Sequence, residues 1–362
     1  MDSTSAGLDF AVIGHQDSWQ HIAALVNSIR TADQEALSAE KIKNIFPFIP
    51  ARDIFKIKAR SKTGAEVNGT YIETFIDPDK LDAQFIRTNI SKVLNALSFA
   101  KKMNARVVTL GGFTSIVLEG NLDPYSTAET KFTTGNTLTA AYIVKGIEKA
   151  ITQHDIELQE SAILIIGATG DIGIACTNYF KGKAKKMLLC ARNNNKLQKF
   201  AGELAKDNIE VAHSISLEEL IPHADIIICV ASSSGIKLTD CKKNVLICDA
   251  GYPKNLETRP GNNGEIHLFH GGMGQISQGY YFSPDYSKAM YHYEAPYISH
   301  GCILEAIVLA FENKFESFSS GKGNITTANM EKIYRLSVKH GIDVAPFYNA
   351  SGLWKRQPEL IY

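Results

Sequence analysis

The sequence predicts an α/β protein with two domains, one of them built on a doubly wound parallel sheet. Three observations predict this fold. The chain has 362 residues, of which 44% are hydrophobic, and this is enough to bury two cores. Its second half alternates short apolar runs with segments of helical periodicity, which is typical of a parallel sheet covered on both faces. A glycine-rich turn follows the first of these apolar runs.

The expected elements lie on either side of a polar stretch at residues 152–161. Before it, residues 85–103 carry apolar side chains at helical spacing, and residues 106–110 form a strand. After it, the apolar runs predict strands at residues 162–166, 187–191, 210–213, 225–230, 245–249 and 266–269.

The domain boundaries follow from these elements. An N-terminal α/β domain is expected over residues 1–155 and the doubly wound domain over residues 156–290. The segment 291–362 is expected to be helical and to pack back on the N-terminal domain.

Composition excludes several classes of function. Lysine plus arginine equal aspartate plus glutamate at 38 each, so no excess positive field favours nucleic acid. The six cysteines form no CxxC pair, and Cys190, Cys229 and Cys248 fall in apolar runs, as thiols do in a reducing cytoplasm. The N-terminus lacks the features of a signal peptide, and no apolar run is long enough to span a bilayer. Peripheral membrane contact stays open.

A dinucleotide fingerprint follows the strand at residues 162–166. Glycines in such a turn let the backbone approach a pyrophosphate, and the following helix N-terminus presents free N–H groups to it. The spacing is GxxGxxG rather than GxGxxG, and a mere packing turn is the alternative. The expected cofactor-binding residues in this Rossmann-type turn are Gly167, Ala168, Thr169, Gly170, Asp171, Ile172 and Gly173.

The next strand indicates which nicotinamide cofactor is bound. NAD-binding proteins place an acidic residue at its end, whereas this strand ends at Arg192, with Lys196 one turn later. A guanidinium can bind a 2′-phosphate, so the pattern favours NADPH, with a solvated arginine as the alternative. Further cofactor contacts are expected after the fourth and fifth strands, at Ala231, Ser232, Ala250 and Gly251.

Cys302 is the candidate nucleophile. It lies outside the doubly wound segment, near the start of an apolar helix and close to His300. The helix dipole and this histidine are expected to favour the thiolate. The alternative is a buried, small hydrophobic residue packed with Ala306 and Leu309.

Three glycine-rich loops accompany Cys302, at residues 111–115, 133–137 and 270–274. Their N–H groups and hydroxyls can bind a carbonyl oxygen, although each loop by itself can equally be a simple turn. Candidate substrate-binding residues are Gly111, Gly112, Phe113, Thr114, Thr134, Gly135 and Asn136. Ser115, Lys254 and His15 are further catalytic candidates, with turn or surface roles as the alternatives.

Nine segments, in this order, resemble the cyanobacterial-type long-chain acyl-[acyl-carrier-protein] reductases. They are FAVIGH, NGTYIET, NALSFAKK, LGGFTSI, KFTTGNT, IIGATGDIG, CDAGYPKN, GCILEAIVLAFE and GKGNIT. The sequence departs from the family in the loosely matching residues 6–53, at Ala250 and Gly251, and in a longer tail after Phe347.

The resemblance implies an NADPH-binding Rossmann domain and an acyl-binding domain built from both ends of the chain. It also implies that Cys302 takes an acyl group from a thioester of acyl carrier protein or coenzyme A and that NADPH reduces it to a fatty aldehyde. An aldehyde-deformylating oxygenase would use that aldehyde in alkane biosynthesis. Mg²⁺ dependence is familiar in the family, although the sequence offers no cluster of metal ligands.

Two other functions compete with this one. A dehydrogenase of the shikimate type shares an N-terminal domain followed by a Rossmann domain and needs no thiol. An NADPH-sensing protein would bind the cofactor without oxidising it.

Overall fold

The structure is a computed structural model that describes residues 7–30, 33–81, 83–252, 254–256, 266–286, 293 and 295–354. Contacts divide the chain into two units, each described here by itself. The first unit comprises Met1–Ala141, Ile276–His292 and Ser299–Asp343. The second comprises Tyr142–Gln275, Tyr293–Ile298 and Val344–Tyr362.

The sheet of the first unit has the strand order β13-β2-β3-β1-β4-β5. Its strands are β1 (Phe10–Gly14), β2 (Arg52–Arg60), β3 (Glu66–Glu73), β4 (Val107–Leu110), β5 (Lys131–Thr133) and β13 (Tyr280–Ser283). Strand β1 pairs in parallel with β3 and β4, and β5 continues the parallel set beyond β4. The chain order therefore reverses between β1 and β4, and this leaves a crevice at the carboxyl ends of these strands.

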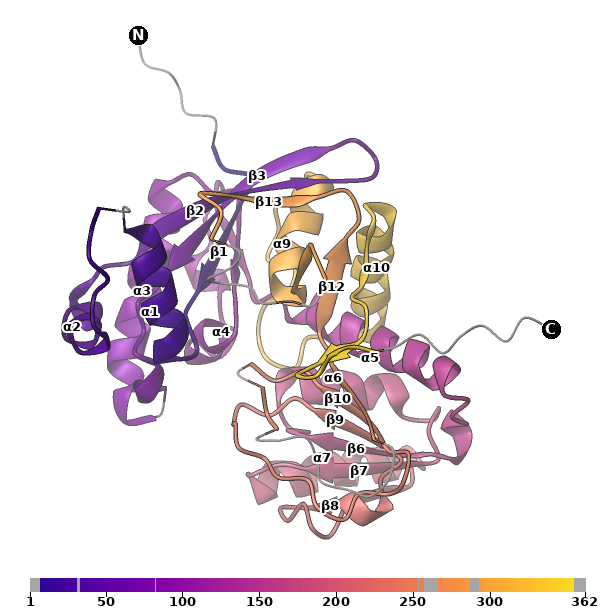
Figure 1. The fold of residues 1–362 in the computed structure, drawn as a ribbon. Coiled ribbons are helices and arrows are strands. Elements are labelled where there is room, and N and C mark those ends of the chain that lie inside the picture. Colours follow the sequence, from indigo (N-terminus) through magenta and orange to yellow (C-terminus); the bar gives the residue numbers. More distant parts are fainter. Residues whose placement is uncertain are drawn as a thin grey trace. The chain divides into compact units, whose positions relative to one another are not determined.

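Helices cover both faces of this sheet (Figure 1). Helix α3 (Ile86–Lys102) packs Val93 and Leu97 against Val108 of β4. On the opposite face lies α9 (Gly301–Phe311), in which every residue from Ile303 to Ala310 is buried. A helix that is apolar on nearly all sides belongs in a core, and this explains why hydrophobic residues fill α9 apart from Glu305. The shorter helices of this part are α1 (Trp19–Ile29), α2 (Ala39–Ile45) and α4 (Phe113–Val117).

The second unit holds a six-stranded, fully parallel sheet in the order β11-β10-β9-β6-β7-β8. The strands are β6 (Ala162–Ile166), β7 (Lys186–Cys190), β8 (Val211–Ser214), β9 (Ile226–Cys229), β10 (Leu246–Asp249) and β11 (His267–His270). Counted along the chain this is the order 3-2-1-4-5-6, the doubly wound arrangement of dinucleotide-binding folds. The helices α5 (Asn136–Gln153), α6 (Asp171–Phe180) and α7 (Asn194–Lys206) alternate with these strands along the chain.

The predicted fold class is confirmed, and all six predicted strands of the doubly wound sheet exist within two residues of their expected bounds. The boundary expected at residue 155 differs from the observed division after Ala141. The first residues of α5 group with the first unit, and the rest of the helix groups with the second.

The C-terminal segment is less helical than predicted. Beside α9 and α10 (Thr327–Lys339) it contains β14 (Ile298–His300), β15 (Ile342–Val344), β16 (Tyr348–Asn349) and β17 (Gly352–Leu353). Strands of two or three residues carry no readable periodicity. Residues 344–362 group with the second unit rather than with the N-terminal part.

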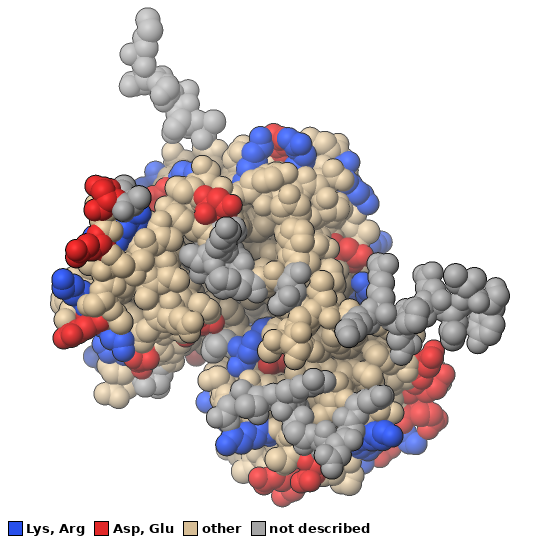
Figure 2. Space-filling model, viewed as in Figure 1, with Lys and Arg blue, Asp and Glu red and all other residues tan. Residues whose placement is uncertain are grey.

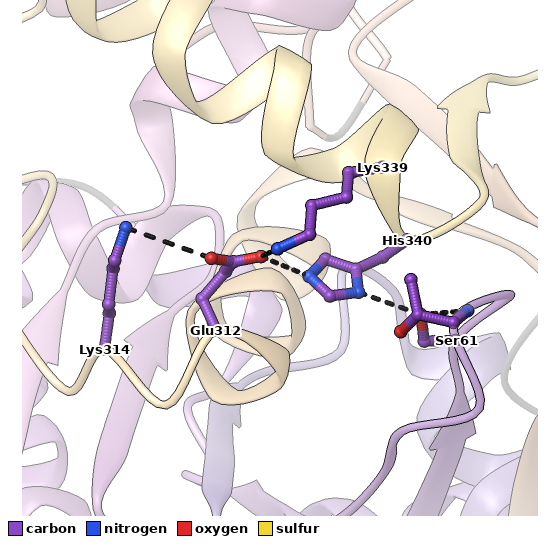
Figure 3. Close-up of polar contacts among 6 residues, drawn as sticks. Ser61, Glu312, Lys314, Lys339 and His340 are labelled. Atoms are coloured by element: carbon purple, nitrogen blue, oxygen red, sulfur yellow. Dashed lines mark hydrogen bonds and ion pairs between the residues drawn. The ribbon is translucent and has the colours of Figure 1, made fainter.

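A polar cluster joins α10 to the turn between β2 and β3 (Figure 3). The Ser61 hydroxyl hydrogen-bonds His340 Nδ1 at 2.8 Å, and His340 Nε2 contacts Glu312 at 2.7 Å. Burial acts to raise the pKa of Glu312, but Lys339 and His340 hold it below its ordinary value. Ser61 is only 2% exposed, so this Ser-His-Glu arrangement ties distant segments together and offers no accessible nucleophile.

No helix in the described ranges combines the length and the apolar character needed to cross a membrane. Figure 2 shows acidic and basic side chains interspersed over the visible face, in keeping with the equal numbers of each sign in the sequence.

Candidate active site

The crevice of the first sheet collects the predicted catalytic region. His15 directly follows β1, Gly111 follows β4 and Thr133 ends β5. Cys302 reaches this point from the first turn of α9, where the Thr109 hydroxyl donates to its carbonyl oxygen at 2.8 Å. A Cβ atom on Gly111 would lie 3.6 Å from the Cys302 sulfur. Ligands bind at such reversal points in open α/β sheets.

The Cys302 thiol is protonated at rest. Nearby backbone N–H groups, those of Ile303 and Gly112 among them, act to lower the pKa of the thiol. Burial outweighs them and raises the pKa of the thiol to about 12, and the nearby Glu305 carboxylate acts in the same direction. The expectation that the helix dipole and His300 favour a resting thiolate was therefore wrong.

Two of the three glycine-rich loops meet at Cys302. Gly111 of the first loop approaches the sulfur, and Gly135 of the second, at φ +69°, packs directly on the cysteine backbone. A Cβ atom on Gly135 would lie 2.3 Å from Cys302 Cα, so only glycine fits there. Thr134 and Asn136 flank it in the same loop. The third loop lies in the second unit, where a Cβ atom on Gly271 would lie 2.2 Å from the Cys248 sulfur.

His15 and Ser115 support the loop that contacts Cys302. Burial lowers the pKa of His15, so its ring is neutral. Its Nε2 accepts the Phe113 N–H at 3.2 Å, and its Nδ1 contacts the Gln16 carbonyl at 3.0 Å. The Ser115 hydroxyl donates to the Gly112 carbonyl at 2.9 Å, and that of Thr114 to the Gly111 carbonyl at 2.8 Å. These bonds fix the peptide groups of the loop.

Sequence reasoning missed Glu305, which lies one helical turn after Cys302 and is fully buried. Its carboxylate accepts the Thr133 hydroxyl at 2.6 Å, the Ser319 hydroxyl at 2.8 Å and the Leu138 N–H at 3.1 Å. The signal was present, because residues three apart share one helix face and an acidic residue interrupts an otherwise apolar helix.

Two more buried groups at this crevice were missed. Glu73 ends β3, and burial raises its pKa to about 7 although the side chains of Gln16 and Tyr71 both hydrogen-bond it. Burial also raises the pKa of Tyr280, and the neighbouring Cys302 raises it further. Only the fold brings these residues together.

The candidate cofactor site lies at the reversal point of the second sheet, between β6 and β9. Gly167 has φ +92°, and a Cβ atom there would lie 2.8 Å from the Ala231 nitrogen. A Cβ atom on Gly173 would lie 2.2 Å from the Gly167 carbonyl oxygen, so α6 packs tightly on the turn. Ala168, Thr169 and Gly170 complete the turn, and Asp171 and Ile172 begin α6. This cradle fits the backbone approach that a dinucleotide pyrophosphate needs.

The remaining cofactor candidates surround this turn. Arg192 Nη2 donates to the Ser232 hydroxyl at 3.1 Å, which joins the ends of β7 and β9. Lys196 lies in the first turn of α7, where its N–H bonds the capping Asn193 side chain.

A buried Asn255, which the sequence did not single out, joins two cofactor loops. Its amide donates to the Ala231 carbonyl at 2.8 Å and the Ser233 carbonyl at 2.6 Å. Asp249 accepts the N–H groups of Gly251 and Asn255, each at 3.1 Å. Ala250 lies between these loops, after β10.

Lys254 belongs to the second unit, at the end of β10. Its ammonium donates to the Asp249 carbonyl at 3.2 Å, and burial lowers its pKa. Across the described residues, no group of three or more His, Cys, Asp or Glu side chains is arranged to hold a metal ion.

A comparison with characterised proteins decides the family. The chain is 34% identical over 309 residues to the long-chain acyl-[acyl-carrier-protein] reductase of Synechococcus elongatus, with 81% of this chain and 87% of that protein covered. The chain belongs to the long-chain acyl-[acyl-carrier-protein] reductase family. This confirms the resemblance seen in the motifs, and the prediction that the protein is an enzyme, an oxidoreductase.

Other similarities of this family member are more limited. The family model of shikimate / quinate 5-dehydrogenase matches residues 148–270 alone, which hold the doubly wound sheet and lack Cys302. The aminotransferase PigE of Serratia is 25% identical over 84% of this chain and 35% of that protein. L-tryptophan dehydrogenase from Nostoc punctiforme is 14% identical, with a TM-score of 0.33 over 70% of this chain and 65% of that one. Similarity at this last level carries no functional argument.

Proposed function

We propose that this protein reduces a long-chain fatty acyl thioester of acyl carrier protein, or of coenzyme A, to a fatty aldehyde with NADPH. The reaction passes through an acyl group bound to Cys302. The observation that carries the proposal is the position of Cys302 at the reversal point of the first sheet, where Gly111 and Gly135 of two glycine-rich loops approach it. The named reductase of Synechococcus elongatus supports the substrate class.

The first step transfers the acyl group. Because the thiol is protonated at rest, it must lose its proton as its sulfur attacks the thioester carbonyl. The new carbon–sulfur bond forms, the bond to the carrier sulfur breaks, and the carrier leaves as the thiol that takes up the proton. The N–H groups of the glycine loop around Gly112 stabilise the negative charge on the carbonyl oxygen.

The second step reduces the acyl group. When bound, NADPH supplies a hydride to the thioester carbon. The bond from that carbon to the Cys302 sulfur then breaks, the aldehyde leaves, and the sulfur regains a proton. The same loop N–H groups serve the oxygen in both steps, and the buried crevice limits hydrolysis of the acyl-enzyme.

The cofactor preference rests on Arg192. This guanidinium, with Ser232 beside it and Lys196 nearby in α7, suits a ribose 2′-phosphate better than free ribose hydroxyls. The dehydrogenase family model over residues 148–270 supports a nicotinamide cofactor in this unit.

Partners and location are part of the same proposal. Acyl carrier protein is the acyl donor, and an aldehyde-deformylating oxygenase is the consumer of the aldehyde. The six cysteines are free thiols, which supports a cytoplasmic setting. The apolar fatty aldehyde favours peripheral contact of the protein with a membrane. Mg²⁺ dependence belongs to the same proposal, with the phosphates of the substrate or cofactor as its ligands.

Intact-protein mass spectrometry tests the function. The wild type, mixed with a long-chain acyl thioester, is expected to gain one acyl group that NADPH discharges as aldehyde. Cys302→Ala is expected to gain none while binding NADPH with unchanged affinity. Cys241→Ala, which removes a buried thiol of the second unit, is the matched control and should behave as the wild type. An alanine variant at position 302 that still forms aldehyde would overturn the proposal.

A further inference from the structure

Glu305 is an acidic residue in the core of the first unit, where burial raises its pKa. Its side chain is 0% exposed and lies on α9, three residues after Cys302. Burying a carboxylate is costly unless its oxygens are hydrogen-bonded. The hydrogen-bond partners of Glu305 therefore indicate its role.

Those partners lie on three separate segments. Thr133 ends β5 and donates to one carboxylate oxygen at 2.6 Å. Leu138, in the first turn of α5, donates its N–H to the other oxygen at 3.1 Å, and Ser319 donates to that oxygen at 2.8 Å. The carboxylate therefore caps the amino end of α5 from a neighbouring helix, where an anion is favoured.

Further bonds close the network around the same loop. The Ser319 N–H donates to the Thr133 hydroxyl at 3.0 Å, and the Thr137 N–H donates to the Ser319 hydroxyl at 3.1 Å. The loop at residues 133–137 is thus held at both of its ends, and Gly135 between them rests on the Cys302 backbone.

The charge of Glu305 does not serve to activate the thiol. It raises the pKa of Cys302, which opposes formation of the nucleophile. The hydrogen bonds to its oxygens, rather than an effect on the thiol, therefore explain why a carboxyl group is buried here.

We propose that Glu305 is a positioning residue of the acyl-transfer site, which holds the loop at residues 133–137 on Cys302 and thereby fixes one wall of the space for the acyl carbonyl. This inference rests on the proposed function for its chemistry. The loop, α5 and α9 keep their geometry only while both carboxylate oxygens accept their hydrogen bonds.

The test compares four variants with the wild type. Glu305→Gln removes the charge, and Thr133→Val removes one donor if the first variant fails to fold. Thr133→Ser keeps that donor and should restore activity. Glu312→Gln is the matched control, because Glu312 follows the same helix, has ionic partners of its own and contacts neither glycine loop of the site.

Two rates are measured in each protein. The first is the single-turnover rate of acylation by a C16 acyl-coenzyme A, followed by intact mass. It should fall about 10- to 100-fold in Glu305→Gln and Thr133→Val, because misplacing a reacting group by about 1 Å has such an effect. The second is the rate of Cys302 alkylation by iodoacetamide at fixed pH, which should rise about threefold or more as the loop leaves the thiol.

Opposite changes in the two rates, absent from Thr133→Ser and Glu312→Gln, are the expected result. Wild-type acylation by Glu305→Gln, or equal losses in Glu312→Gln, would overturn the positioning role. If the wild type itself takes no acyl group, the proposed function fails, and the alkylation rates alone then decide whether Glu305 holds the loop.

Discussion

His15 and Glu73 belong to one chain of buried hydrogen bonds that ends at the Cys302 loop. The Glu73 carboxylate accepts the Gln16 side chain at 3.0 Å, the Gln16 carbonyl contacts His15 Nδ1, and His15 Nε2 accepts the Phe113 N–H. Each group fixes the next one. A substitution of Glu73, which is far from Cys302 in sequence, is therefore expected to displace the loop through these hydrogen bonds.

Glu73 makes stability depend on pH in an unusual direction. Its pKa is raised from 4.5 to about 7 in the folded protein, which therefore holds a proton that the unfolded chain has lost between these values. The free energy of unfolding must then fall as pH rises through this window. In Glu73→Gln nothing titrates there, so the stability of the variant relative to the wild type should increase by up to about 3 kcal/mol.

Urea unfolding at pH 5 and pH 8 checks this, with Trp19 as the probe. The chain has two tryptophans, and Trp354→Phe leaves only Trp19, in the first unit. A stability difference that stays constant between the two pH values would show that Glu73 titrates as an ordinary carboxyl group.

At the scale of single residues, the sequence singled out candidate site residues that lie close together, but not the protonation of Cys302. Cys302 and two glycine loops could be singled out by motif, and the structure brings them together. The sequence could not show how completely α9 is buried, so the expected thiolate was wrong. Glu73, Glu305 and Tyr280 come from separate segments, and only the sheet order makes them neighbours.

Among the elements, the turn between β6 and α6 was the most predictable. The turn requires glycine for local reasons, namely a positive φ at Gly167 and close packing at Gly173. Such local requirements can be recognised in a sequence. The β12 strand (Met273–Ile276) and the short C-terminal strands have no recognisable sequence pattern, because only their pairing with other strands defines them.

The end of β7 gives a prediction for cofactor choice. Arg192→Glu should weaken NADPH binding by about 10- to 100-fold and leave NADH binding nearly unchanged, because a carboxylate repels the 2′-phosphate and tolerates ribose hydroxyls. Titration of nucleotide fluorescence measures both affinities. Lys199→Glu, the same charge reversal at an exposed position on α7, is the control. Equal losses for both nucleotides in Arg192→Glu would remove this residue from the 2′-phosphate site.

At the scale of the whole molecule, chain order and spatial order differ. Three separated segments build the first unit, and α9 and α10 complete a sheet whose first strand begins 291 residues before α9 does. Composition and periodicity predicted two domains, but the division falls inside α5, where no break in the sequence pattern marks it.

The cluster around His340 stabilises this assembly of distant segments. His340→Ala removes the buried imidazole that bridges Ser61 and Glu312, which should lower the stability of the first unit by about 1 to 3 kcal/mol. Trp19 fluorescence during urea unfolding reports the change, and NADPH affinity in the second unit should stay the same. The control is Arg335→Ala, at an exposed position of the same helix. A stability within about 0.5 kcal/mol of the wild type would contradict the bridging role.

The high pKa of the Cys302 thiol also affects how readily oxidants react with the protein. Peroxide attacks thiolates, and the raised pKa of Cys302 keeps most of its thiol protonated at pH 7. The other five cysteines are buried, whereas Cys302 is partly exposed, and burial raises their pKa values too. If Cys302 is the nucleophile proposed above, its sulfur is thus expected to resist oxidation as long as no thioester is bound.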